Sequence, residues 1–302
     1  MHLYITMYTD YKKWLYLIVL SLIWGSSYIL IKKGLIALSP IQLGSLRILF
    51  TFSILAIAGY KHLKTIPVNK WIWIGLSGFL GTFFPNYLFA YAETKIDSAI
   101  AAVLNGLTPL FTLLFGLFFF GIGLKRKKLL GVVVGLFGTV ILVIKQVQNT
   151  GIENGLYLLL VVIAALCYAA NVNIIKYRLQ GISSLGIALG NFVVISIPTL
   201  AIFFASGFLE LNFQTIAVQH SIGYIFILAV FGTAMAKVVF NELVAISSPV
   251  FSSSITYLLP VVAIFWGVLD GEQLGWEQFA ASMIIMAGVY LVTDTKKIRP
   301  SK

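Results

Sequence analysis

The chain has 302 residues, of which 60% are hydrophobic and only 10% are charged, and its formal net charge is +11. A soluble domain is closer to half apolar and about a quarter charged, so this composition excludes an ordinary soluble domain. Apolar runs of about 20 residues, separated by short polar loops, indicate one polytopic membrane domain.

The apolar runs predict an all-α membrane protein with ten transmembrane helices. At about 1.5 Å of rise per residue, each run is long enough to cross a hydrocarbon core of roughly 30 Å. We expect a short leader at 1–12 and a basic tail at 294–302, both cytoplasmic. In chain order, the predicted spans are 13–34, 40–60, 71–93, 97–120, 128–145, 154–177, 184–208, 221–242, 249–269 and 276–293.

The placement of lysine and arginine predicts how these spans are oriented. With the N-terminus inside, the inner segments carry 15 of the 21 cations and the outer segments carry 4, while Arg47 and Lys237 lie within spans. This distribution fits the positive-inside rule with both termini in the cytoplasm. Topology therefore explains the net positive charge, and nucleic-acid binding is not expected. The first run is too long for a signal-peptide core, so we interpret it as the first span.

The chain also matches itself, which predicts two copies of a five-helix unit at 13–145 and 154–293. Because five is an odd number of spans, the second copy would enter the membrane from the opposite side as an inverted repeat. Inverted repeats commonly build alternating-access transporters with a substrate site near the midplane. Shifts of 144 and 151 residues align Trp24 with Tyr168, Arg47 with Asn191, Gly81-Thr82 with Gly232-Thr233, Asn86 with Lys237, and Pro109 with Pro260.

Several short motifs resemble the EamA family of the drug/metabolite transporter superfamily. They are Trp24-Gly25-Ser26-Ser27-Tyr28 with Lys32-Lys33-Gly34, Leu46-Arg47-Ile48, Leu107-Thr108-Pro109 and Leu259-Pro260. The resemblance covers residues 13–293 and implies an inner-membrane permease that exports metabolites, amino acids or toxic small molecules. It also implies a central cavity lined mainly by the first, third, fourth, sixth, eighth and ninth spans. Since the second copy has Tyr168 and Asn191 at the positions of Trp24 and Arg47, arginine-based chemistry would be one-sided.

Small polar residues recur every three or four positions along the 97–120 and 249–269 spans. Such stripes fit either the wall of a cavity or a tight helix–helix contact. We favour the cavity, because Asn105 and the prolines exceed what packing needs. On the other spans, aromatic rings beside amides suit organic substrates of moderate size. The expected substrate-path residues are Trp24, Tyr28, Asn86, Asn105, Thr108, Pro109, Tyr168, Asn171, Ser252, Thr256 and Pro260.

Pro109 and Pro260 are expected to interrupt backbone hydrogen bonding in the middle of their spans. The freed carbonyl groups, near Asn105 and Thr256, could accept hydrogen bonds from a ligand or allow the helix to bend. Alternatively, each proline makes a static kink that the hydroxyl groups of Thr108 or Thr256 satisfy.

Four charged residues are candidates for gating or for charge recognition: Arg47, Glu93, Lys237 and Glu242. Arg47 could attract a substrate carboxylate or phosphate, but a structural or gating role, through snorkelling or a bridge to loop acids, is favoured. Snorkelling to the headgroups is the default expectation for Lys237. Because no acid lies near the centre of a span, Glu93 and Glu242 are the candidates for any proton coupling.

Two other classes of protein remain as alternatives to a transporter. The Gly75-Leu76-Ser77-Gly78 segment resembles a protease serine motif, but no span supplies a central histidine as a base, so we do not expect an enzyme, a metal site or a cofactor. A non-transporting assembly subunit or receptor is the second alternative. Gly131 and Gly135 form a GxxxG pattern, which indicates either helix packing or a homodimer. The expected partners are a small-molecule substrate and the lipid bilayer.

Overall fold

The computed structural model describes residues 2–121, 126–272 and 275–293, and within them every regular element is a helix. Eight segments are long and apolar enough to span a membrane: Tyr11–Gly34, Pro40–Leu63, Val68–Ala92, Ser98–Phe119, Gly155–Arg178, Ser184–Ala205, Ile216–Ile246 and Pro249–Leu269. Two shorter apolar helices, Leu130–Ile141 and Phe279–Gly288, lie where the fifth and tenth spans are predicted. The predicted all-helical, multi-span fold is confirmed.

Several of the spanning segments are made of more than one helix. The elements are α1 (His2–Gly25), α2 (Ser27–Gly34), α3 (Pro40–Leu63), α4 (Trp71–Gly78), α5 (Phe84–Ala92), α6 (Ser98–Asn105), α7 (Thr108–Phe120), α8 (Arg126–Thr150), α9 (Ile152–Arg178), α10 (Ser184–Ala205), α11 (Ile216–Ile227), α12 (Ala236–Ile246), α13 (Pro249–Ser253), α14 (Leu259–Leu269) and α15 (Trp276–Thr293). Two π-helical turns, η2 (Phe79–Phe83) and η4 (Leu228–Met235), join α4 to α5 and α11 to α12.

The α6–α7 and α13–α14 segments are interrupted at corresponding positions, which corrects the prediction of a proline within a continuous helix. Pro109 and Pro260 stand in the first turn of α7 and of α14, after the break. Proline suits that position because the backbone N–H it lacks would have no partner inside the helix. The Asn105 carbonyl accepts a hydrogen bond from the Thr108 hydroxyl at 2.7 Å. The Thr256 hydroxyl donates to the Ser253 carbonyl at 2.9 Å. At both breaks, a nearby threonine hydroxyl therefore hydrogen-bonds to a backbone carbonyl group.

Two long helices also begin in the same way in both copies. At the start of α3, the Ser39 hydroxyl accepts from the Gln42 backbone N–H at 3.3 Å, and the Gln42 side-chain oxygen accepts from the Ser39 backbone N–H. At the start of α10, the Ser183 hydroxyl accepts from the Gly186 backbone N–H at 3.1 Å. Ser39 and Ser183 are related by the 144-residue shift. A serine cap satisfies an N–H group that the helix itself leaves free, so it fixes where each helix starts.

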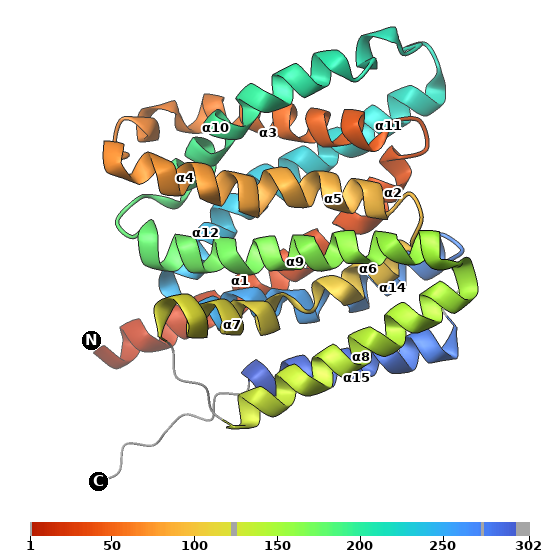
Figure 1. Cartoon of the computed structure of the whole chain (residues 1–302). Coiled ribbons are helices and arrows are strands. Elements are labelled where there is room, and N and C mark those ends of the chain that lie inside the picture. The colour runs from red at the N-terminus through yellow and green to blue at the C-terminus, as the bar shows by residue number, and fades with distance from the viewer. Residues whose placement is uncertain (1, 122–125, 273–274, 294–302) are drawn as a thin grey trace.

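Helices of the first half of the chain pack against helices of the second half. In Figure 1, α3 lies beside α10 at the top of the view and α8 lies beside α15 at the bottom, and both pairs are in contact. The remaining helices lie between these two pairs, with α9 next to α5, α6 and α7. The middle of the molecule is therefore enclosed by segments from both halves of the chain.

The glycines of α8 pack against α15 of the same chain, so the structure does not support the homodimer considered from the sequence. A Cβ atom on Gly288 of α15 would lie 2.3 Å from the backbone N of Gly135 and 2.7 Å from the carbonyl O of Gly131. The GxxxG pattern allows α15 to approach the α8 backbone directly. Small residues commonly allow this kind of close helix contact in membranes.

Gly288→Val is expected to destabilise the protein, because backbone atoms cannot move aside as a flexible side chain can. Separating α8 from α15 should cost about 1–3 kcal/mol and lower the melting temperature in detergent. Gly223→Val is the matched control, because a Cβ atom there meets nothing within 4 Å. Equal melting temperatures for the two variants would show that the α8–α15 contact is not tight.

Candidate functional site

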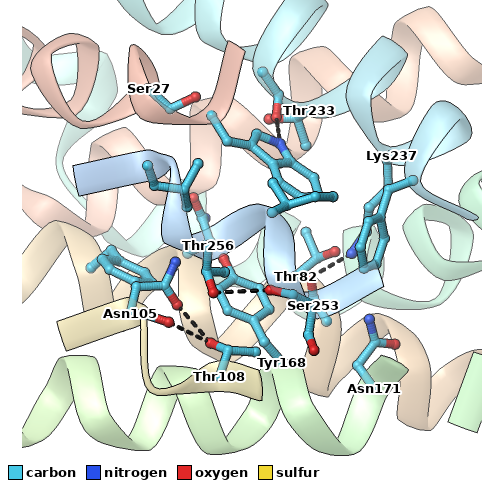
Figure 2. Close-up of a pocket in the computed structure, with 18 of the residues that line it drawn as sticks. Ser27, Thr82, Asn105, Thr108, Tyr168, Asn171, Thr233, Lys237, Ser253 and Thr256 are labelled. Carbon is cyan, nitrogen blue, oxygen red and sulfur yellow. Dashed lines mark hydrogen bonds between the residues drawn. The ribbon is translucent and has the colours of Figure 1, made fainter. Parts of the chain in front are cut away.

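A cavity of about 100 Å³ lies between the two halves of the chain. Figure 2 shows polar side chains from both halves around this space. Its wall is built from α1, α2, α3, η2, α5, α6 and α7 of the first half and from α9, η4, α12, α13, α14 and the turn between α13 and α14 of the second. The spans that the family resemblance implies all contribute, and α3 adds Arg47.

Most of the residues expected on the substrate path lie in this wall. The structure brings together Trp24, Tyr28, Asn86, Asn105, Thr108, Tyr168, Asn171, Ser252 and Thr256, together with Arg47 and Lys237. Pro109 and Pro260 are not among the lining residues. They stand in the first turns of α7 and α14, the helices that follow the breaks. The lining residues absent from that expectation are Ser27, Ile31, Gly81, Thr82, Phe89, Val172, Gly232, Thr233, Phe240, Ser253, Ile255 and Leu259.

The lining residues form pairs across the internal repeat. The 144-residue shift relates Trp24 to Tyr168, Ser27 to Asn171 and Tyr28 to Val172, and the 151-residue shift relates Thr82 to Thr233, Asn86 to Lys237, Phe89 to Phe240 and Asn105 to Thr256. Applying the offsets to the candidates Asn171, Tyr28 and Thr108 would have found Ser27, Val172 and Leu259 from the sequence. The π-helical turns η2 and η4 carry the Gly-Thr pairs into the wall, and π-turns often occur at functional sites.

Asn105 is at the centre of one group of polar and aromatic contacts. Its Nδ2 donates to the Tyr28 hydroxyl at 2.9 Å, and its Oδ1 accepts from the Thr108 hydroxyl at 3.0 Å. The Tyr28 ring packs edge-on against Phe89, with centroids 5.7 Å apart, and Phe89 stacks on Tyr168 at 6.1 Å. These contacts connect α2, α5, α6, α7 and α9 beside the break that follows Asn105.

Trp24 occupies the side of the cavity formed by the second half. Its indole N–H donates to the Gly232 carbonyl at 2.9 Å, and its ring packs at a tilt against Phe240, with centroids 5.1 Å apart. Thr82, also in the cavity wall, is buried, and its hydroxyl has no hydrogen-bond partner among the described residues. A buried hydroxyl without a partner is costly unless a ligand or water satisfies it, so Thr82 is available to bind an occupant of the cavity.

Arg47 and Lys237 extend from different halves into the same cavity. Arg47 donates from Nε to the Thr233 hydroxyl at 2.8 Å and from Nη1 to the Asn86 side-chain oxygen at 3.4 Å. Lys237 donates to the Gly81 carbonyl at 2.5 Å and is 6% exposed. The expectation that Lys237 snorkels to the headgroups is therefore wrong, because its ammonium group is bound inside the protein. The bridge from Arg47 to the loop acids is also not formed, since its hydrogen bonds go to Thr233 and Asn86.

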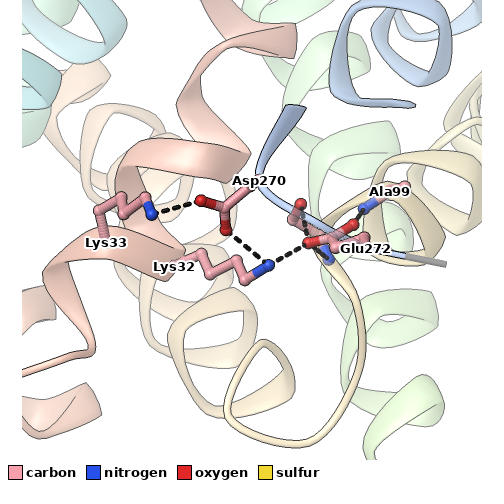
Figure 3. A network of polar contacts seen from close by, with 6 residues as sticks. Lys32, Lys33, Ala99, Asp270 and Glu272 are labelled. Atoms are coloured by element: carbon pink, nitrogen blue, oxygen red, sulfur yellow. Dashed lines mark hydrogen bonds and ion pairs between the residues drawn. The ribbon is translucent and has the colours of Figure 1, made fainter. Parts of the chain in front are cut away.

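A network of ion pairs joins the two halves where α2 ends and α6 begins (Figure 3). Lys32 lies 2.8 Å from an Asp270 oxygen and 2.9 Å from a Glu272 oxygen, and Lys33 pairs with Asp270. Glu272 also accepts from the Ser98 hydroxyl at 2.7 Å and from the backbone N–H groups of Ser98 and Ala99 at 3.2 and 3.3 Å. A carboxylate from the second half therefore caps a helix of the first half.

The hydrogen bonds from Lys32 and then Lys33 hold the pKa of Asp270 below its ordinary value. A carboxyl group whose pKa is lower in the folded protein stabilises the fold above its unfolded pKa. This part of the network is therefore intact at neutral pH and is lost as acid protonates Asp270.

The two acids considered for coupling lie outside the cavity wall and differ from each other. Glu93 is 8% exposed, one helical turn beyond Phe89, and in the part of the chain that the structure describes neither of its carboxyl oxygens has a hydrogen-bond partner. The Glu242 side chain is 38% exposed and is paired with Lys12 at 2.5 Å and with the Tyr16 hydroxyl at 2.9 Å. Glu242 links α1 to α12 near the surface, whereas Glu93 is buried at the end of α5.

Ser77, the serine of the protease-like motif, is hydrogen-bonded to side chains of two other helices. It is fully buried, and its hydroxyl donates to the Asn171 side-chain oxygen at 2.6 Å. Asn191 also contacts this hydroxyl at 3.2 Å. These partners are amides rather than a base that could activate a serine. They connect α4 to α9 and α10.

The family assignment follows from a sequence comparison. The model of the EamA-like transporter family matches the chain twice, over residues 12–144 and 155–294. The chain belongs to the EamA-like transporter family. As a member of the EamA-like family, it is a multi-pass membrane transporter, whose partners are a small-molecule substrate and the lipid bilayer.

Known EamA-like relatives match almost the whole chain. "Uncharacterized inner membrane transporter YedA" of Escherichia coli (strain K12) is 29% identical over 307 residues, covering 95% of this chain and 92% of that protein. "Probable amino-acid metabolite efflux pump" of Salmonella typhimurium is 27% identical and covers 89% and 90% of the two chains. A solved crystal structure aligns with a TM-score of 0.66 over 92% of this chain and 95% of the other, at 18% identity, which indicates a shared fold. These relatives, with the apolar helices, support a multi-pass inner-membrane protein.

Proposed function

We propose that this protein exports small organic metabolites by alternating access at the cavity between two inverted five-helix repeats. The observation that carries the proposal is the cavity wall, in which repeat-related residues of the two halves face one shared space. A transporter of this architecture binds its substrate at the interface of the repeats, and rocking of the halves exposes that site to each side in turn. The double match to one family model and the α3–α10 and α8–α15 pairs support the duplication.

The broken helices support a substrate site in the same place. Interrupted helices in transporters expose backbone groups near the midplane and give flexible points for movement. Here the breaks at α6–α7 and α13–α14 bring Asn105 and Thr256 into the wall. Aromatic rings with a few polar groups suit an organic molecule of moderate size.

The substrate class and the direction of transport are taken from the family and its relatives. Two relatives are named as amino-acid metabolite efflux pumps, so export of amino acids, related metabolites or toxic compounds is the expected activity. Cytoplasmic termini, in line with the positive-inside rule, would put the Lys32–Glu272 network on the outer side.

The test of transport is counterflow in liposomes. A sensitivity screen of a deletion strain against a panel of amino acids and toxic metabolites would first identify a transported compound. Proteoliposomes loaded with that compound should then accumulate its radiolabelled form transiently and saturably. A receptor or an assembly subunit would bind the compound without counterflow, and that outcome would reject the carrier.

The inverted arrangement has a separate test. In a Cys167→Ser background, cysteines at Gln148 and at Lys64, both of which are exposed, should react with an impermeant thiol reagent from opposite sides of the membrane. Opposite sides are expected because three predicted spans, an odd number, lie between the two positions. Labelling of both cysteines from the same side would mean that the halves are not antiparallel.

A further inference from the structure

The cavity wall contains two cationic side chains and, among its described lining residues, no acidic side chain. Arg47 comes from α3 of the first half and Lys237 from α12 of the second. Their hydrogen bonds go to a threonine hydroxyl, an amide oxygen and a backbone carbonyl, all of them neutral acceptors. The cavity therefore has a positive wall without a counter-charge of its own.

Each cation also has donors to spare. Within the described part of the chain, Arg47 Nη2 has no recorded hydrogen bond, and the Lys237 ammonium group makes one, to the Gly81 carbonyl. Arg47 retains some accessible surface, whereas Lys237 is 6% exposed. Guanidinium and ammonium groups together can bind several oxygens of one anionic group.

The ion pairs recorded elsewhere do not neutralise these two side chains. Asp270 is paired with Lys32 and Lys33, and Glu272 is paired with Lys32. Glu242 is paired with Lys12. Within the described residues, no ion pair joins Glu93 to Arg47. Unpaired cations inside a membrane protein are costly, and such residues commonly mark the path of a substrate or an ion.

We propose that Arg47 and Lys237 together bind the oxyanion, a carboxylate or a phosphate, of the transported molecule. This inference depends on the proposed carrier function and specifies its substrate class as organic anions. Trp24, Phe89, Tyr168 and Phe240 supply aromatic surface for the remainder of such a molecule. The unsatisfied hydroxyl of Thr82, one residue from the Gly81 carbonyl that holds Lys237, supplies a further donor.

The site is expected to be single, because the repeat does not duplicate it. Asn86 stands at the position equivalent to Lys237, and Asn191 at the position equivalent to Arg47. Asn191 is fully buried and contacts the Ser77 hydroxyl, so it does not join the cavity wall. One oxyanion is therefore held between the halves, where each contributes one cation.

The experiment measures anion binding without transport. The melting temperature of the purified protein in detergent is titrated with benzoate and phenyl phosphate, and with benzamide and phenol as their neutral counterparts, at constant ionic strength set by sodium chloride. At least one anion should raise the melting temperature saturably, and its neutral counterpart should not. Arg47→Gln and Lys237→Met should each increase the half-saturating concentration by roughly ten-fold or more.

Matched substitutions outside the cavity separate loss of charge from loss of folding. Arg178→Gln and Lys70→Met should keep the response of the unchanged protein, because Arg178 stacks on Trp73 and Lys70 is bonded to the Arg178 carbonyl. Arg47→Lys should recover part of the response if charge is what matters.

A melting temperature that responds to neither anion, or equally to an anion and its neutral counterpart, would overturn the proposal. Saturable counterflow of a neutral compound with no anion response would overturn the oxyanion site and leave the carrier intact. An anion response without any counterflow would overturn the carrier instead.

Discussion

Asn105→Leu is expected to reduce substrate flux by roughly 10–100-fold, while the protein still inserts into the membrane in normal amounts. Leucine is close to asparagine in size but can neither donate to the Tyr28 hydroxyl nor accept from the Thr108 hydroxyl. Leaving a buried polar group without its partner costs about 1–3 kcal/mol, which corresponds to a loss of this order. The measurement is initial uptake into proteoliposomes, normalised to the amount of protein.

Asn212→Leu provides the matched control, since Asn212 is exposed and its side chain contacts the Gln214 backbone N–H. The control should transport at the rate of the unchanged protein. If Asn105→Leu also transports normally, the break between α6 and α7 is not part of the substrate path.

Glu272→Ala is expected to lower the melting temperature in detergent by roughly 5–10 °C, which corresponds to about 3 kcal/mol. The carboxylate side chain is 2% exposed and contacts Lys32, the Ser98 hydroxyl and two backbone N–H groups of α6. Its removal leaves the start of α6 uncapped and removes one of the two carboxylates, Asp270 and Glu272, that join the halves at this end. The proposed movement of the halves would separate these contacts, so the substitution should also change the rate of transport.

Glu210→Ala distinguishes this effect from a general loss of negative charge, because Glu210 is exposed and lies in a short helical turn between α10 and α11. Its melting temperature should stay within about 1 °C of the unchanged protein, as is usual for surface substitutions. A similar small change for Glu272→Ala would mean that the network contributes little to holding the halves together.

The membrane spans and much of the cavity wall could be predicted because lipid imposes strong constraints on sequence. Length and hydropathy locate the spans, and polar residues within them are rare enough that Asn105, Asn171 and Thr256 stand out. The repeat offset then pairs Trp24 with Tyr168 and Asn86 with Lys237, which are residues the fold brings to one cavity. Pattern and periodicity contain this information directly.

The partners of individual side chains could not be predicted, because they depend on contacts between distant spans. Lys237 lies near the predicted end of its span, yet its ammonium group reaches the backbone carbonyl of Gly81 in the other half of the chain. The glycines of α8 likewise pack on Gly288, more than 150 residues later in the chain. Only the folded chain distinguishes these contacts from snorkelling and from a homodimer.

Alternating exposure of the cavity is tested most directly by one cysteine in its wall. Ser253→Cys, in a Cys167→Ser background, places a thiol at a lining position that is 2% exposed. An impermeant thiol reagent should modify it from either side of the membrane, in right-side-out and in inside-out vesicles, and a transported compound should slow both reactions. Modification from one side only, or from neither, would contradict alternating access at this cavity.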